Sequence, residues 1–160
     1  MHYDIEPCVG VGPLHLGMTE LQVHEVIGKP FFARPTRAGL KELYASDPGT
    51  PLIGCVYGID GAVSRLASIG VMKNVHDLSY RGVKLFQIGR LAAVKRLMQD
   101  DSDVRETVSF LIFPKLGINL TGFHNGRDED LAVGVFARGH WDKQLDRMKP
   151  FALPARATEV

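Results

Sequence analysis

The sequence has little of several features that mark whole classes of protein. Two cysteines, Cys8 and Cys55, occur in 160 residues, whereas a small secreted scaffold usually holds its fold together with more. Their spacing fits no zinc motif, because neither a C-x-x-C pair nor a paired-histidine spacing is present. We therefore expect free thiols in a reducing compartment, with one bridge between the two as the alternative.

Long apolar runs and an excess of one charge are also missing. No stretch approaches the roughly 20 apolar residues of a membrane span, and the first ten residues lack the basic and apolar regions of a signal peptide. The formal net charge is +1, so no overall field draws the chain to nucleic acid or anionic lipid. A basic cluster at Arg34, Arg37 and Lys41 is narrower than nucleic-acid binding needs. We expect a cytoplasmic protein with no nucleic-acid and no membrane partner.

Patterns of catalytic and metal-binding residues are missing as well. The sequence holds no G-x-S-x-G, no H-E-x-x-H and no phosphate-binding loop. No two of the six histidines have the i,i+4 or i,i+2 spacing that helps build a metal site, and we expect His15 and His24 to point to solvent. Cys55 lies in an apolar strand and is expected to behave as a small hydrophobic residue. These observations predict a protein that is not an enzyme and has no cofactor and no metal.

The chain does have the composition of an ordinary globular protein. Hydrophobic residues make up 45% of it and charged residues 23%. A chain of this length can bury one good core or two small cores side by side. We expect a single compact domain over residues 1–152, followed by a loose C-terminal tail over residues 153–160.

The clearest local signal is the segment from Gly10 to Pro30, which predicts a short strand, a helix and a stop. Thr19 stands at the N-cap position and Gln22 follows three residues later, which makes a capping box. Gly28 stands at the C-terminal end of the helix, and Pro30 prevents its continuation.

The rest of the chain predicts mostly strands and one further helix. We expect residues 31–39 to be a connection, and strands over the ranges 41–45, 52–58, 62–72, 82–85, 107–113, 118–123 and 131–137. Asp60-Gly61 predicts a hairpin turn, residues 91–98 a second helix, and residues 139–148 a last short helix. The order strand, helix, three strands therefore occurs twice, in residues 10–72 and 80–138. The predicted fold class is α+β, with an antiparallel sheet, helices packed on one face, and a tandem repeat of the strand-helix-three-strand unit.

The segment from Leu14 to Pro30, with its Leu-Gly-Met-Thr opening, resembles the first helix of the small outer-membrane-assembly lipoproteins (the SmpA/OmlA, or BamE-like, type). It also resembles the repeats of the beta-lactamase inhibitory proteins, and similar openings occur in small bacterial immunity proteins. The resemblance implies an antiparallel sheet covered by helices, in single or tandem copies, used to bind other proteins. Fold alone does not fix function.

Two acidic clusters and one tryptophan are the candidates for a partner-binding surface. Asp100, Asp101 and Asp103 follow the second predicted helix, while Asp128, Glu129 and Asp130 lie in a predicted loop between strands. Both clusters are typical of solvated surface, and both could instead steer a basic partner. Trp141 is the only tryptophan: it is an interface anchor if exposed and a clamp for the C-terminal segment if buried.

The function predicted is that of a non-enzymatic protein-binding module, an immunity protein that binds and neutralises a cognate bacterial toxin. The alternatives are a small-ligand-binding protein or enzyme with a pocket between sheet and helices, and a cell-envelope assembly protein. The sequence predicts no oligomeric state.

Overall fold

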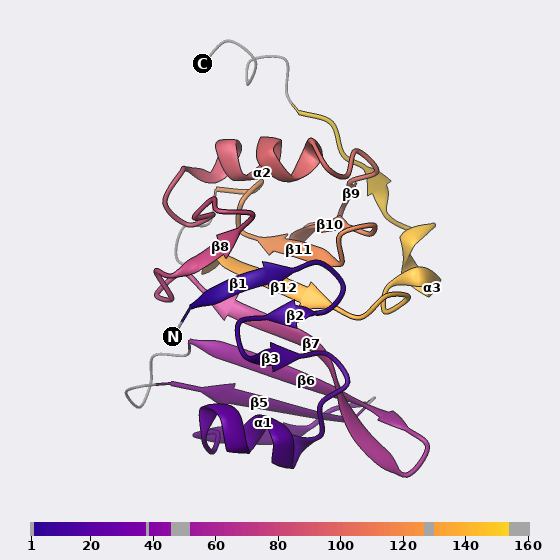
Figure 1. Cartoon of the computed structure of the whole chain (residues 1–160). Helices are drawn as coiled ribbons and strands as arrows, with labels where there is room; N and C mark the ends of the chain where they lie inside the picture. The colour runs from indigo at the N-terminus through magenta and orange to yellow at the C-terminus, as the bar shows by residue number, and fades with distance from the viewer. Residues whose placement is uncertain (1, 38, 46–51, 127–129, 154–160) are drawn as a thin grey trace.

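The computed structural model of the chain describes residues 2–37, 39–45, 52–126 and 130–153 (Figure 1). They form two β-sheets and three helices, which confirms the α+β class and the antiparallel character of the main sheet. The helices are α1 (Glu20–Ile27), α2 (Arg90–Met98) and α3 (Asp142–Leu145). None of the helices in the described ranges has the length and apolar character needed to cross a bilayer.

The larger sheet has nine strands in the order β13-β9-β10-β11-β12-β7-β6-β5-β4, and every pairing in it is antiparallel. Its strands are β4 (Phe32–Pro35), β5 (Gly39–Tyr44), β6 (Ile53–Asp60), β7 (Val63–Met72), β9 (Arg105–Glu106), β10 (Phe110–Phe113), β11 (Ile118–Thr121), β12 (Ala132–Phe136) and β13 (Lys149–Pro150).

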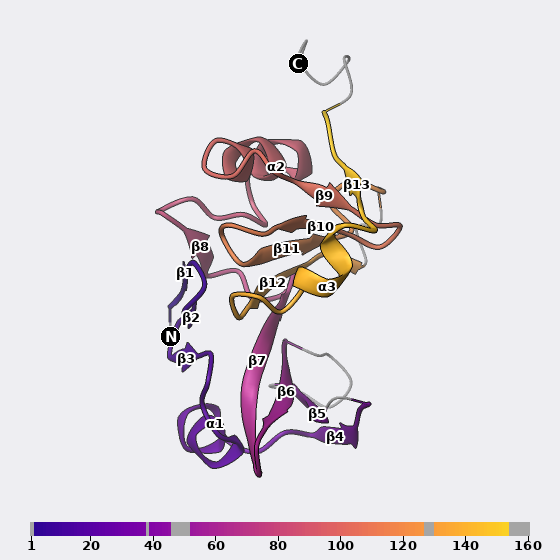
Figure 2. The same cartoon turned by 90° about the vertical axis from the view of Figure 1, so that its right-hand side faces the viewer.

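The smaller sheet has four strands in the order β3-β2-β1-β8. They are β1 (Tyr3–Glu6), β2 (Gly10–Val11), β3 (Leu14–His15) and β8 (Leu78–Tyr80). The smaller sheet and α1 lie on one side of the long strand β7 (Figure 2). Helix α3 lies away from them, beside the ends of β10 and β12 (Figures 1 and 2).

The two faces of the nine-stranded sheet differ in burial. Side chains alternate between faces along a strand, and residues paired across strands share a face. One face is buried throughout its central strands, at Glu42, Tyr44, Ile53, Cys55, Ile69, Val71, Ile118, Leu120, Val133 and Val135. The other face is half-buried at Lys41, Leu43, Val56, Ser68, Gly70, Met72, Asn119, Thr121 and Ala132, whereas Gly54, Ile112, Gly134 and Phe136 on the same face are buried. We call this second face the open face.

Helix α1 forms as its local signals predict. The Thr19 hydroxyl accepts a hydrogen bond from the Gln22 backbone at 3.3 Å, and the Gln22 side chain accepts one from the Thr19 backbone at 2.9 Å. At the other end, Gly28 has a φ of 85° and donates its N–H to His24, so the helix stops there. Val23 is the fully buried residue of this helix, and it fixes α1 to the core.

Thr19→Ala is expected to lower the free energy of unfolding by about 1 kcal/mol, because the cap loses its side-chain acceptor. Urea denaturation of the variant and the parent measures this difference. Equal midpoints would show that the capping box does not stabilise the fold.

The longest pairing in the sheet is the hairpin of β6 and β7, whose turn the Asp60-Gly61 pair predicts. Gly61 has a φ of 65°, which glycine adopts at little cost. Helix α2 also agrees with its prediction and buries Ala93, Val94 and Leu97, although Gly89 supplies no side-chain cap.

Several predictions about the strands are wrong. Residues 82–85 do not form a strand: Arg81 and Gly82 have positive φ values, and the chain turns back so that Tyr80 bridges Val83. Residues 31–39 are not a simple connection, because they contain β4, in which Pro35 is tolerated at the sheet edge. The tandem repeat is not confirmed, since the first half places two strands in the small sheet that have no counterpart in the second half.

The C-terminal segment packs against the rest of the chain up to residue 153, the first residue of the predicted tail. Strand β13 pairs with β9, and Phe151 donates its N–H to Val104 at 2.9 Å. Phe151 and Leu153 are half-buried and pack against the core. Residues 154–160 lie outside the described ranges.

Candidate functional site

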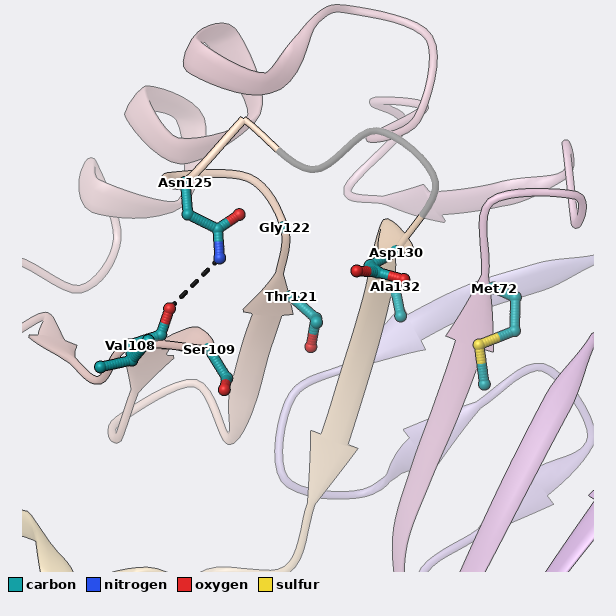
Figure 3. Close-up of a pocket in the computed structure, with 8 residues that line it drawn as sticks. All are labelled: Met72, Val108, Ser109, Thr121, Gly122, Asn125, Asp130 and Ala132. Atoms are coloured by element: carbon teal, nitrogen blue, oxygen red, sulfur yellow. Dashed lines mark hydrogen bonds between the residues drawn. The ribbon is translucent and has the colours of Figure 1, made fainter.

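A pocket of about 350 Å³ opens on one end of the open face (Figure 3). Its floor is one row of the sheet, in which Thr121 on β11 pairs with Ala132 on β12, and Ala132 pairs with Met72 on β7. Its rim comes from two loops, which supply Val108, Ser109, Gly122, Asn125 and Asp130. The sequence-based alternative placed a pocket between the sheet and the helices. This pocket lies elsewhere, on the face of the sheet turned away from α1.

Val108 is the most exposed large apolar side chain in the described residues, with 91% of its surface accessible. The turn that carries it is well held: the Thr107 hydroxyl accepts hydrogen bonds from the backbone of Ser109 and Phe110. His124 contacts the Thr107 carbonyl at 2.9 Å through Nε2, and Asn125 donates its amide to the Val108 carbonyl at 3.2 Å (Figure 3). A fixed turn therefore presents an apolar side chain to solvent, so a partner would order little on binding it.

The pocket offers hydrogen-bonding groups of several kinds. Asp130 supplies a carboxylate, Asn125 an amide, and Ser109 and Thr121 hydroxyls. This set suits a cationic or polar group of a partner, such as a lysine or arginine side chain, because carboxylate, amide and hydroxyl oxygens accept hydrogen bonds from such groups. Within the described ranges, no three His, Cys, Asp or Glu side chains gather in a way that could hold a metal ion.

A second pocket of about 350 Å³ lies on the other side of Val108, against the segment that follows α3. Trp141, at the start of α3, is half-buried, and its ring centroid lies 5.4 Å from that of Phe110 and 5.3 Å from that of His140. Trp141 is thus neither fully buried nor exposed: its ring packs α3 against Phe110, the first residue of β10, and part of its surface stays accessible. Its role as an interface anchor stays a prediction.

Asp101, a member of the first acidic cluster, is buried, with 1% of its surface exposed. Its carboxylate accepts hydrogen bonds from the backbone of Asp103 at 3.0 Å and Lys115 at 2.8 Å, and so joins the end of α2 to the β10–β11 turn. A partner cannot reach this carboxylate in the folded protein. Asp103 is half-exposed and pairs with Arg105 at 3.1 Å.

Asp100 is also engaged within the protein. Its Oδ2 accepts hydrogen bonds from the Tyr80 hydroxyl at 2.5 Å, from Arg81 at 2.9 Å and from Arg96 at 3.0 Å. The Tyr80 hydrogen bond, with the two arginines, holds the pKa of the Asp100 carboxyl below its usual value. The stability this gives is present above the usual aspartate pKa and is lost on acidification through the lowered one.

The second acidic cluster is described only in part. Asp130 is exposed and lines the first pocket, whereas Asp128 and Glu129 lie outside the described residues. The structure thus brings Asp130 to the same face as Val108 and places Trp141 nearby, but it does not join the first cluster to them. The role of these residues in partner binding stays a prediction.

A buried polar cluster lies on the covered face, beneath α1, and the sequence did not reveal it. His24 Nε2 lies 2.9 and 3.2 Å from the two carboxylate oxygens of Glu42, which is 3% exposed. The Tyr44 hydroxyl donates to the same carboxylate at 2.7 Å. The prediction that His24 faces solvent is therefore wrong: it turns inward because Glu42 needs a partner in the core.

Cys55 and Tyr57 lie beside this cluster on β6 and are fully buried. Burial, with the nearby Glu42 carboxylate, raises the pKa of the Cys55 thiol to about 12. Burial also raises the pKa values of Tyr44 and Tyr57 well above their usual range. The thiol therefore stays protonated and uncharged at neutral pH, which suits the role of a small hydrophobic residue that the sequence predicts for Cys55. Both Cys55 and the half-buried Cys8 are free, so the alternative of one bridge is wrong.

Comparisons with protein-family models, with curated proteins and with solved structures give no match for this chain. The resemblance to lipoprotein, inhibitor and immunity families therefore rests on the segment from Leu14 to Pro30 alone. What the chain does must be argued from its own surfaces.

Sequence reasoning missed the residue that stands out most in the pocket. Val108 lies within the range predicted as a strand, and nothing in Thr-Val-Ser distinguishes an exposed turn from a buried strand. His124 and Asn125 hold the turn from 17 residues away along the chain, so no local signal could have shown it.

Proposed function

We propose that this protein is a non-enzymatic protein-binding module that neutralises a bacterial toxin by covering part of the toxin's surface. The observation that carries the proposal is the Val108 turn, which displays a 91% exposed apolar side chain from a hydrogen-bonded frame. A preorganised apolar side chain loses little conformational freedom when a partner buries it, so more of the contact energy appears as affinity.

The pocket beside this turn supports a partner with a basic surface. A lysine or arginine of the toxin would enter between Asp130 and Asn125, while Val108 packs against apolar surface around it. The Asp130 carboxylate would act mostly on the rate and specificity of association, because it lies at the accessible rim. As part of the same proposal we place the protein in the cytoplasm, where its two free thiols persist.

Val108→Asp is expected to weaken binding of the cognate toxin by about tenfold or more, because it puts a charge where the anchor is desolvated.

Asp130→Lys is expected to slow association, with a smaller effect at high salt. The partner to use is the product of the neighbouring gene, expressed with each variant while cell survival and the dissociation constant are measured.

The matched control is Leu21→Asp, which changes an apolar side chain that is 74% exposed on α1, away from the open face. It is expected to protect cells as well as the parent does. Full protection by Val108→Asp, or no binding of the neighbouring product by the parent, would contradict the proposal.

A further inference from the structure

Two cations stand directly opposite each other at the far edge of the open face. Arg34 on β4 pairs with Lys41 on β5, and Lys41 pairs in turn with Val56 on β6. Like charges in cross-strand positions are destabilising. Arg34 is exposed and Lys41 half-buried, and no carboxylate of the described residues forms an ion pair with either one. The fold thus keeps a charge arrangement that weakens it.

An apolar pair lies next to these cations on the same face. Phe32 pairs with Leu43 two residues along each strand, and the Phe32 side chain is 46% exposed. We call these four residues, Phe32, Arg34, Lys41 and Leu43, the β4–β5 patch. Arg37, exposed in the turn that joins the two strands, adds a third cation beside it.

Glu42, next to Lys41 in the chain, and Asp130, at the edge of the open face, do not neutralise the patch. Glu42 alternates to the covered face, where His24 and Tyr44 engage it. Asp130 lies on the open face but beyond β12, with β6 and β7 between it and β5. The cations therefore face solvent together, beside an apolar surface and with no counter-charge from the described part of the chain.

We propose that the β4–β5 patch binds an acidic segment of a partner protein, in which a carboxylate lies close to an apolar side chain. Arg34 forms bidentate hydrogen bonds with a carboxylate, Lys41 adds charge, and Phe32 with Leu43 receives the apolar side chain. The segment lies across the open face rather than along the sheet edge, because Pro35 lacks the N–H that strand addition would use.

A protein segment fits this patch better than nucleic acid does. Nucleic-acid binding usually neutralises many phosphates along an extended basic stripe. Here three cations stand together, and half of the patch is apolar. This inference rests on the proposed function in that it assigns the toxin an acidic segment, but its test does not need the toxin.

The test uses a short labelled peptide of alternating glutamate and leucine, titrated with the full chain and followed by fluorescence anisotropy. Binding is expected to weaken with rising salt, and Arg34→Glu is expected to weaken it by about tenfold or more. The same substitution puts a glutamate opposite Lys41 and should raise the melting temperature by about 1 to 3 °C, so that lost binding cannot reflect unfolding.

The matched control is Lys115→Glu, which makes the same charge change at an exposed lysine of the β10–β11 turn. It is expected to bind the peptide as the parent does. An equal loss in Lys115→Glu, no binding by the parent, or tighter binding of a short single-stranded RNA through the same patch would overturn the proposal. Peptide binding without binding of the neighbouring gene's product would reject the proposed function and keep this inference.

Discussion

Glu42→Ala is expected to lower the free energy of unfolding by about 3 kcal/mol, because it removes one partner of a buried polar pair. Glu42 is 3% exposed and accepts from His24 and Tyr44, so its loss leaves the Tyr44 hydroxyl in the core without its acceptor. The contact also joins α1 to β5, so the variant should loosen the helix. Urea denaturation followed by circular dichroism measures the change.

Glu25→Ala is the matched control, because Glu25 is an exposed glutamate on α1, the helix that carries His24. It should change the free energy of unfolding by no more than about 0.5 kcal/mol. A loss of less than about 1 kcal/mol for Glu42→Ala would mean that the cluster beneath α1 stabilises the fold little.

Asp101→Ala has the second large effect, with an expected loss of about 3 kcal/mol, because two backbone N–H groups lose their acceptor. The carboxylate joins Asp103 and Lys115, which lie 12 positions apart along the chain, so α2 and the β10–β11 turn would separate more easily. Thermal or urea unfolding of the purified variant gives the measurement.

Asp103→Ala provides the comparison for this prediction. Asp103 is 49% exposed and makes a surface ion pair with Arg105, so its loss should cost no more than about 1 kcal/mol. If Asp101→Ala were as stable as Asp103→Ala, the aspartates after α2 would be a solvated surface, and Asp101 would return as a candidate for partner binding.

The sequence predicts well those parts of the fold that depend on residues close together along the chain. Thr19 and Gln22 are three residues apart and cap α1 as expected, and Asp60-Gly61 makes the hairpin between β6 and β7. Most of the strands after it also lie within a few residues of their predicted ranges. In each case the physics is local, so residue type and spacing are sufficient.

The errors concern features that depend on the whole chain. The prediction for residues 82–85 fails because Arg81 and Gly82 turn the backbone, which an apolar pattern does not show. Strand β4 escaped prediction because Pro35 is typical of a loop and is also compatible with an edge strand, a position that only the topology reveals.

The candidate site shows the same division. Asp130 could be singled out by charge, yet its neighbours Met72 and Val108 in the pocket come from distant strands and turns. His24 and Glu42 lie 18 residues apart and meet only when α1 packs on β5. Arg34 and Lys41 were visible as a basic cluster, but their opposition on one face follows from the register of β4 and β5.

The claim that the open face is the binding surface can be tested most directly by amide hydrogen exchange on the complex with the neighbouring gene's product. Binding should slow exchange in the Val108 turn, at the start of β12 and in β4–β5, and leave α1 and the four-stranded sheet unchanged. Protection confined to α1 and the four-stranded sheet would show that the partner binds the opposite side, and would contradict the account.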